Sequence, residues 1–464
     1  MATRPAIKTF TGSSIDVLNA IRNTASMNYR DYIPVAHEGD DIKRIGNIIM
    51  DFPALQNEFL TALVNRIGLV LMTNKEFSNP WSMFKRGRLD YGETIEEIFV
   101  EIAEPFIYDV KASETEHFKR EIPDVRSAFH VLNYRTFYKV TIQHAQLRQA
   151  FLSETGVTDL ISKIIESMYT GAEYDEFHTM KYLLARNALN GKLTPVELPE
   201  VSEQSGETVG MKQVVGRIKS TSNTMEFMSD EYNVAGVRNV SKKTDQYMIL
   251  NTAFDAIMDV EVLATAFNMD KASFMGHRVL VDSFGKIDDE RLQKLMGDLY
   301  EPLTAEEQAL LDSIPGILVD KDFFMVFDNL NEFQENRNAQ GLYWNYFYHV
   351  WKTFSTSPFA NNAIFVYGTP TVGEVSISPT EVTARPGSKV NFDPAITVTN
   401  FAPKSLNWEV DDHGEHANGA PLVWIDGSGT LNIDKDVETG TVITVTATSS
   451  FDETKTATAT VTVS

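Results

Sequence analysis

The last part of the chain is patterned with a period of two. Ala457–Val463 alternates apolar and polar positions without a break, and Leu406–Val410 and Thr441–Thr448 follow the same rule. Successive side chains of a strand point to opposite faces, so this alternation in β-branched residues predicts short strands with one buried face. Turn residues separate the runs at short intervals. We therefore predict an all-β sandwich over residues 370–464, beginning after Tyr367–Gly373.

A helical period dominates residues 158–190. Thr158 is a candidate N-cap, and Gly191 is a candidate stop signal. A helix of this length spans about 50 Å at 1.5 Å per residue, long beside ordinary globular helices. We predict a strut that crosses an elongated molecule. Its apolar stripe consists of Ile161, Ile164, Ile165, Met168, Ala172, Tyr174, Phe177, Met180, Leu184 and Ala188.

Strand and helix patterns alternate between the long helix and the β-domain, which predicts an α+β region. Thr304-Ala305-Glu306-Glu307 forms a capping box at the start of the second predicted helix. The polar stretch 331–341 is expected to be an exposed connection, and residues 193–210 a mobile loop. Strands are expected at 246–251, 278–283, 316–327 and 342–367, and helices at 260–267 and 305–311.

Two apolar arms, 68–72 and 95–102, flank a long loop at 79–92. Its interleaved aromatic and basic residues are compatible with a single-strand nucleic-acid platform. They are also compatible with a hairpin that docks on a neighbouring subunit and whose basic side chains meet acidic residues. The overall charge of -23 favours the second interpretation. The residues expected in such an intersubunit contact are Trp81, Phe84, Lys85, Arg86, Arg88, Asp90, Glu93, Glu96 and Glu97.

Composition narrows the class of protein. With 43% hydrophobic residues, the 464-residue chain can bury more than one core. The absence of cysteine excludes disulfides, thiolate metal sites and a cysteine nucleophile. The charge of -23 argues against a dedicated nucleic-acid binder. No secretory signal and no apolar run approaching about 20 residues is evident, so a soluble protein made in the cytoplasm is expected.

The sequence offers no sign of catalysis. Phosphate-binding glycine loops, a nucleophile elbow and a His-Glu-x-x-His helix are all missing. The segment Asp411–His416 could ligate a divalent ion, but it lies where a β-domain turn is expected, and a solvated loop is the favoured interpretation. We expect no catalytic, cofactor-binding or metal-binding residues, and no enzyme.

Several blocks resemble a known family. Asp16–Asn23, Val64–Val70, Asn79-Pro80 with Phe84–Gly87, and Thr94–Ile98 are similar to the major capsid proteins of picovirus-type small podophages. The longest similar blocks are Leu318–Leu330 and Gly341–Trp351, and weaker similarity runs over most of residues 15–367. Residues 374–464 resemble the bacterial immunoglobulin-like group 2 domain, with its tryptophan at Trp408 and its Asp-x-x-Gly-x-Leu turn at Asp426–Leu431.

The resemblance implies the Hong Kong 97-type capsid fold, which is α+β with a long spine helix, an extended loop and an axial domain. Here an all-β immunoglobulin-like sandwich would be added. It assigns residues 1–67 to an N-terminal arm, 68–110 to the extended loop along a neighbouring subunit, 111–224 and 341–369 to a peripheral domain with spine helix 158–190, 225–340 to the axial domain, and 370–464 to the immunoglobulin-like domain.

The function that the resemblance implies is structural. Copies would assemble in the host cytoplasm into pentamers and hexamers around a scaffolding protein, and the virion capsid would hold a portal protein and enclose DNA. The inner face would touch that DNA without binding it specifically, and no membrane would be involved. We expect that reversing Lys85, Arg86 and Arg88 to Glu leaves the subunit folded but abolishes particles.

Two other classes of function remain open. An exported surface adhesin or cell-wall binding protein could present a ligand through its immunoglobulin-like module, but it would need an export signal. A carbohydrate-active enzyme with an appended β-sandwich would need a deep, carboxylate-lined cleft in the first 367 residues.

Overall fold

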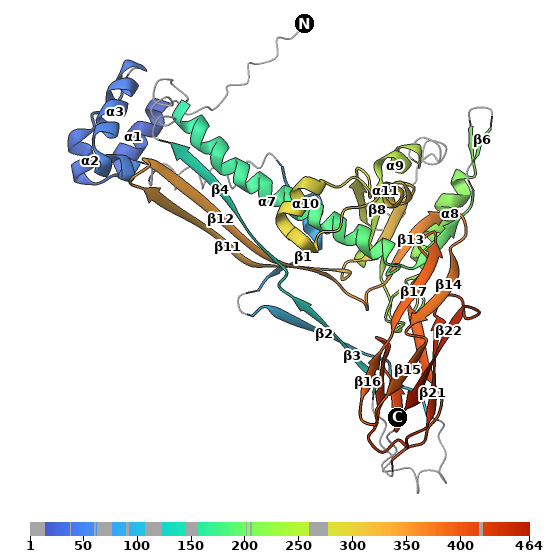
Figure 1. The fold of residues 1–464 in the computed structure, drawn as a ribbon. Helices are drawn as coiled ribbons and strands as arrows, with labels where there is room; N and C mark the ends of the chain where they lie inside the picture. The colour runs from blue at the N-terminus through green and yellow to red at the C-terminus, as the bar shows by residue number, and fades with distance from the viewer. Residues whose placement is uncertain are drawn as a thin grey trace.

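The computed structural model of the chain is elongated, with an arm, a central body and a C-terminal domain that points away from both (Figure 1). It describes residues 14–37, 39–59, 62, 77–89, 92–106, 123–143, 156–200, 202–204, 207–258, 277–416 and 421–464. The predicted apolar arm 68–72 and the predicted helix 260–267 lie outside these residues.

One helix, α7 (Gly156–Leu189), runs from the tip of the arm into the body (Figure 1). It confirms the helix predicted over residues 158–190. The helix ends at Leu189, two residues before Gly191, whose φ of +66° favours glycine. A Cβ atom built on Gly191 would also lie 2.7 Å from the backbone nitrogen of Lys404, so a side chain there would clash with the base of the C-terminal domain.

The arm consists of a four-stranded sheet, the first half of α7 and three N-terminal helices. The sheet has the order β1-β11-β12-β4, in which β1 (Lys85–Arg88) is parallel to β11 and the other neighbours are antiparallel. At the tip, the N-terminal helices share a core with Ile142, Ile165, Trp344 and Tyr346. The remaining elements are β4 (Tyr134–Gln143), β11 (Phe324–Asn338), β12 (Tyr343–Thr356), α1 (Ser14–Thr24), α2 (Met27–Tyr32) and α3 (Gly39–Asp51).

The polar stretch 331–341 was predicted to be a connection, and this prediction is wrong. Residues 331–338 continue β11 and pair with β12 up to Asn338. Among the described residues, the part of β11 beyond Asp328 pairs with β12 alone, because β1 ends there. Edge strands carry polar and charged residues, which explains why the composition of this stretch resembled that of an exposed connection. The hairpin β11–β12 also crosses the domain boundary predicted at residue 340.

The body is built on a five-stranded sheet with the order β5-β13-β10-β8-β9. It confirms the strand at 246–251, the helix at 305–311 and the capping box at Thr304, and the strand predicted at 278–283 lies at 277–281. The predicted strands 316–327 and 342–367 are each two strands, because the chain leaves one sheet and enters the other after Asp320 and after Thr356. Residues 193–210 contain three strands rather than a loop only. The elements are β5 (Pro195–Leu198), β6 (Ser202–Gln204), β7 (Glu207–Val209), α8 (Met211–Thr224), β8 (Gln246–Asn251), α9 (Thr252–Met258), β9 (His277–Val281), α10 (Asp289–Met296), α11 (Ala305–Asp312), β10 (Gly316–Asp320) and β13 (Asn362–Tyr367), with short 3-10 turns at 82–84, 243–245 and 297–299.

The C-terminal domain contains only strands among its described residues, as predicted. Its main core is formed by side chains from two sheets, β15-β22-β21-β18 and β16-β20-β19, and β14 pairs with β17 beside them. The strands are β14 (Thr371–Ser378), β15 (Glu381–Ala384), β16 (Lys389–Asn391), β17 (Asp393–Thr399), β18 (Leu406–Val410), β19 (Val423–Ile425), β20 (Thr430–Ile433), β21 (Val442–Ser449) and β22 (Thr456–Val463).

Candidate assembly interface

The segment 77–88 is anchored inside the subunit. Trp81 and Phe84 are 0% and 2% exposed. The Trp81 ring lies 5.4 Å from that of Phe177, and the Phe84 ring 4.8 Å from that of Phe324. Both rings belong to the core of the body, so neither can stack on a nucleic-acid base. The same burial leaves neither ring free to contact a neighbouring subunit.

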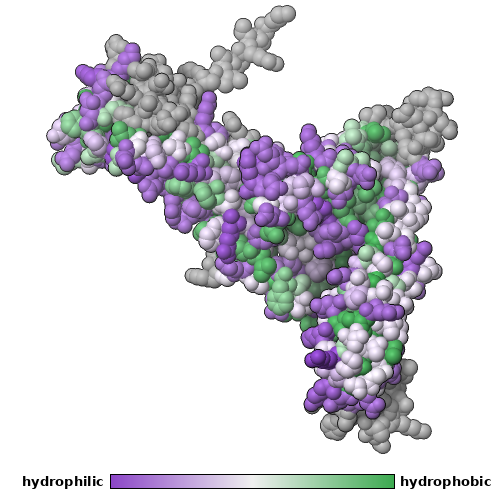
Figure 2. All heavy atoms as spheres, viewed as in Figure 1, coloured by the Kyte–Doolittle hydropathy of each residue, from purple (hydrophilic) through white to green (hydrophobic). Residues whose placement is uncertain are grey.

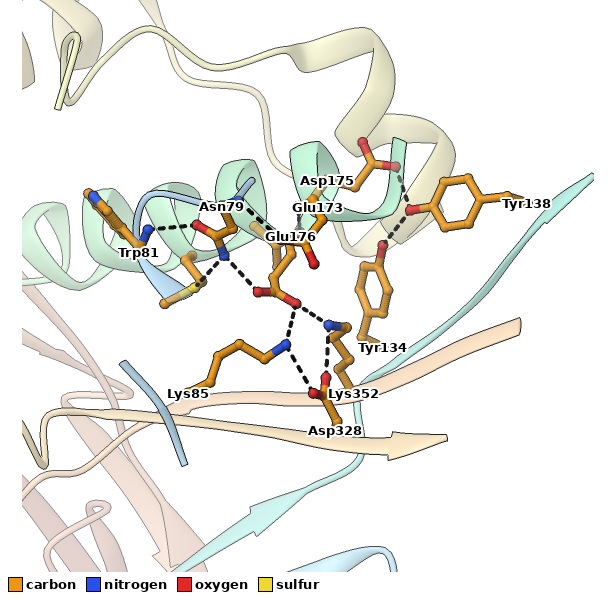
Figure 3. A network of polar contacts seen from close by, with 12 residues as sticks. Asn79, Trp81, Lys85, Tyr134, Tyr138, Glu173, Asp175, Glu176, Asp328 and Lys352 are labelled. Carbon is orange, nitrogen blue, oxygen red and sulfur yellow. Dashed lines mark hydrogen bonds and ion pairs between the residues drawn. The ribbon is translucent and has the colours of Figure 1, made fainter. Parts of the chain in front are cut away.

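Lys85 lies in a buried network of four charges that joins this segment to α7, β11 and β12 (Figure 3). Its ammonium is 3.2 Å from Glu176 and 2.9 Å from Asp328. Lys352 pairs with the same two carboxylates, at 2.8 Å for Asp328. The amide of Asn79 donates to the second oxygen of Glu176 at 2.7 Å. Every carboxylate oxygen of this tetrad of Lys85, Glu176, Asp328 and Lys352 therefore lies within 3.2 Å of an ammonium or amide nitrogen.

The pKa values of two members of the tetrad, Lys85 and Asp328, are shifted toward the charged forms. Burial alone would lower the pKa of Lys85, but the carboxylates of Glu176 and Asp328 outweigh burial and raise the pKa. Burial would raise the pKa of Asp328, and the two ammonium groups lower the pKa instead. Reversing Lys85 to Glu would place three carboxylates together in this site. This geometry argues against the expectation that the triple reversal leaves the subunit folded, and we now expect the reversal to destabilise the subunit.

Within the subunit, the basic side chains of the segment do not pair with the acidic residues that were expected to be their partners. Arg86 forms an ion pair with Asp322 at 2.7 Å, and Arg88 is exposed on β1. Glu93 pairs with Arg135 at 2.6 Å. Asp90 lies outside the described residues. Their contact with a neighbouring subunit stays a prediction.

A two-stranded ribbon follows this segment, formed by β2 (Thr94–Val100) and β3 (Val125–Val131). The seven residues of β2 pair in antiparallel register with β3, from Thr94 opposite Val131 to Val100 opposite Val125. The strand was expected to form a two-armed segment with residues 68–72, so the hairpin lies later in the chain than predicted. The ribbon leaves the junction of arm and body in the same general direction as the C-terminal domain (Figure 1).

The inner face of the ribbon is fixed to its own subunit. His130, which is almost fully buried, lies 2.8 Å from Ser355 and 3.1 Å from Glu97. The other oxygen of Glu97 accepts a hydrogen bond of 2.8 Å from Ser357. The ring of Phe99 stacks on Phe359 at 5.5 Å. Glu97, expected at an intersubunit contact, instead holds the ribbon to β12 and the segment after it.

The outer face of the ribbon is apolar and exposed. Phe129 is 63% and Ile98 58% exposed, although both are large hydrophobic residues. Hydrophobic residues reach the surface in this region of the space-filling view (Figure 2). Glu96 is the one charged residue on this face. The large apolar residues that form the face are Ile98, Val100, Val125, Phe129 and Val131.

Sequence reasoning missed this face. The alternation of Ile98 and Val100 against Phe99 was visible, but the sequence does not show which set is buried. Phe99 and Glu97 face the body, which leaves the aliphatic set in solvent. Contiguous exposed apolar surface of this kind marks an interaction site.

The carboxylates that line an acidic hollow of the body each have a partner within the subunit. One hollow of about 700 Å³ is lined by Asp282, Asp288 and Asp289. Asp282 accepts a hydrogen bond of 2.6 Å from Lys181, and Asp288 caps α10. Asp289 accepts a hydrogen bond from Tyr300. Each of these carboxylates is thus used in holding the fold together.

In the C-terminal domain, His416, Asp434 and Asp436 have candidate ligand atoms within 4.8 Å of one another. The two ring nitrogens of His416 face different carboxylates, at 3.4 Å from Asp434 and 3.9 Å from Asp436. Ordinary pairing between the imidazole and the two acids accounts for this arrangement. Among the helices that the structure describes, none is both long and apolar enough to cross a membrane.

Comparison with known proteins gives consistent results. The model of the Phi29-like phage major capsid protein family matches residues 18–366. The major capsid protein of Bacillus phage PZA is 34% identical over 444 residues, covering 94% of this chain and 93% of the relative. That of Streptococcus phage Cp-1 is 32% identical over 360 residues, covering 75% and 93%. In fold, the chain is similar to a chain in the capsid structure of Staphylococcus phage Andhra, with a TM-score of 0.51 at 13% identity, over 64% of this chain and 86% of that one.

Proposed function

Since this chain belongs to the Phi29-like phage major capsid protein family, we propose that it builds the phage head through contacts of the ribbon's outer face with a second copy. The predictions of a phage major capsid protein and of a place in the virion capsid are confirmed. The mixed α+β fold with likeness to phage capsids is confirmed as well. The adhesin and carbohydrate-enzyme alternatives have no support from the family.

The observation that carries the proposal is the exposed apolar face of β2–β3. Leaving five large hydrophobic side chains in solvent costs free energy that burial at an interface would recover, at about 25 cal/mol per Å². The free energy that a single such contact contributes is modest. In a closed shell each subunit docks its own ribbon on one neighbour and is contacted by the ribbon of another, so the contacts reinforce one another. Pentamers and hexamers that close into an icosahedral head enclosing the DNA are the assembly we propose.

We assign the arm to the peripheral domain of the Hong Kong 97-type fold, with α7 as its spine helix, and the body to the axial domain. The C-terminal domain would be an immunoglobulin-like group 2 sandwich. Its turn supports this assignment: Asp426 accepts backbone hydrogen bonds from Ser428 and Thr430. Gly429, with φ +82°, packs so closely under Trp408 that a Cβ would lie 2.7 Å from the indole.

The remaining partners follow from the capsid role. A scaffolding protein would guide assembly, and a portal protein would replace part of the shell. Packaged DNA would touch the inner face without specific binding, in keeping with the net charge of -23. We propose no catalysis, since the function requires only contacts.

Co-expression of the chain with the neighbouring phage gene products tests the proposed function. Closed, evenly sized shells are expected in negative-stain electron micrographs. Soluble monomers as the sole product, at concentrations where the subunit is folded, would contradict it.

A further inference from the structure

The acidic hollow of about 700 Å³ lies between α7, the segment that leads into β1, and the chain from the end of β9 to the start of α10. Helix α10 packs against α7 beside it (Figure 1). A volume of this size is typical of sites that take a small organic molecule. Part of the wall is apolar, and the residues that form this part are Phe77, Pro80, Phe177, Leu280 and Ile287.

The side chain of His178, on α7, lines the hollow and leaves its Nδ1 atom without a hydrogen-bond partner. The residue is 7% exposed, and its ring centre lies 4.3 Å from that of Tyr174 and 5.6 Å from that of Phe177. Burial lowers the pKa of His178, and the nearby ammonium of Lys181 lowers this pKa further. The imidazole is therefore neutral, and one of its ring nitrogens can accept a hydrogen bond. A buried polar atom without a partner costs free energy, which a bound donor would recover.

Carboxylates dominate the charge of the hollow. Asp282, Asp288 and Asp289 line it, and among the described lining residues Lys286 is the one with a full positive charge. Asp282 is neutralised by Lys181, at 2.6 Å. In contrast, Asp288 and Asp289 accept their hydrogen bonds from neutral donors, namely a backbone amide and two tyrosine hydroxyls. A carboxylate has about four acceptor sites, so both can accept further bonds from a cation.

The hollow suits an organic cation better than a metal ion. In the part of the chain that the structure describes, a group of three such side chains with ligand atoms within 4.8 Å of one another occurs in the C-terminal domain and not here. The aromatic wall, in contrast, attracts cations through its ring faces. Two cations of the subunit already lie on these rings, with Arg291 at 5.4 Å from the centre of Tyr174 and Lys181 at 5.6 Å from that of Phe177. The apolar wall would hold an alkyl chain, as protein surfaces hold the stems of lysine side chains.

We propose that this hollow binds an alkyl diamine or polyamine in its ammonium form. Its ammonium groups lie at Asp288 and Asp289, an N–H of the ligand is donated to His178, and its alkyl chain packs on Phe77 and Ile287. The bound molecule joins α7 to the start of α10 and therefore stabilises the body. This inference goes beyond the assembly role and does not rest on it, because the hollow is formed within one subunit.

Calorimetric titration of the full-length, unassembled subunit with spermidine tests the inference. At low ionic strength and mildly alkaline pH, we expect one saturable site per subunit. The midpoint of thermal unfolding should rise with spermidine, since a ligand that binds only the folded state stabilises it. Magnesium chloride at equal cation charge is the control and is expected to give neither effect. Binding of spermidine no tighter than that of magnesium would reduce the effect to general charge screening and overturn the inference.

Two aspartate variants locate the site. Asp289→Asn keeps the shape of the side chain and an oxygen that can accept from Tyr300, but it removes a negative charge from the hollow. Spermidine affinity should fall by at least about tenfold, because a hydrogen bond to a charged group contributes more than one such step. Asp298→Asn is the matched control, which removes the same charge from an exposed position outside the lining. It should bind as tightly as the unmodified chain, and equal losses in the two variants would contradict the site.

A substitution at His178 keeps the inference testable if the variant at Asp289 folds poorly. His178→Phe retains an aromatic ring but has no nitrogen to accept a hydrogen bond. Since it removes a buried polar atom that lacks a partner, we expect it to unfold no earlier than the unmodified chain. It should nevertheless bind spermidine more weakly. A folded His178→Phe subunit with unchanged affinity for spermidine would overturn the inference and leave the proposed function standing.

Discussion

Replacing Lys352 by Met is expected to destabilise the subunit by about 3–5 kcal/mol. Lys352 is 6% exposed in its side chain, and Glu176 only 1%. Methionine keeps most of the volume but removes one of two ammonium groups that face two buried carboxylates. Lys85 alone cannot neutralise both, so an uncompensated negative charge stays buried. Urea unfolding of the unassembled subunit, followed by circular dichroism, measures the loss.

The matched control is Lys321→Met. Lys321 also pairs with a carboxylate, Asp245 at 2.9 Å, but the two side chains are 51% and 27% exposed. Exposed pairs contribute about 1 kcal/mol or less, so this variant should unfold near the midpoint of the unmodified chain. Equal losses from the two substitutions would show that the tetrad is not the buried, essential joint described above.

The second large effect is expected at the ribbon. Ile98→Asp combined with Phe129→Asp should leave the unfolding midpoint of the subunit unchanged but abolish closed shells. Both side chains are mostly exposed before assembly, so folding does not depend on them. In a docked ribbon, two carboxylates would be buried against apolar atoms at a cost of at least about 3 kcal/mol per contact. That corresponds to an affinity about 100-fold weaker, repeated at every contact of the shell.

Sedimentation of the expressed protein and negative-stain electron microscopy measure the outcome. Phe451→Asp is the control, since Phe451 is also an exposed ring but lies in the C-terminal domain. It should form normal particles. Normal particles from the ribbon variant would refute the ribbon as an assembly contact.

Local features were the ones that sequence reasoning predicted well. The helix α7, the strand Leu406–Val410 and the capping box at Thr304 depend on periodicity or on residues three positions apart. Each is decided within one turn or one strand, so its signal is written in consecutive residues. The family resemblance then gave the capsid role, which periodicity alone could not.

The candidate contact depended on distant residues and was predicted poorly. Trp81 is buried because Phe177 and Phe324 close around it, and these lie about a hundred and more than two hundred positions away. The acids that neutralise Lys85 are similarly remote. An aromatic and basic segment therefore resembled an exposed docking loop although its core residues are internal. The true exposed face comprises Ile98 and Phe129, and it is recognisable only once β2 is known to pair with β3.

The tetrad and the inner-face contacts of the ribbon together orient the ribbon on the subunit. The tetrad fixes the segment that leads into the ribbon, and the bonds of His130 and Glu97 fix the ribbon's inner face. The ribbon is thus held in a set direction before any partner arrives. A preorganised contact loses less conformational entropy on docking, which favours assembly through many weak contacts.

A side-chain-resolution electron cryomicroscopy reconstruction of the assembled shell tests the central claim most directly. The account predicts that Ile98 and Phe129 lie within about 4.5 Å of atoms of a neighbouring subunit, with the ribbon's outer face shielded from solvent. A shell in which that face remains open to solvent, and in which other surfaces make the contacts between subunits, would contradict it.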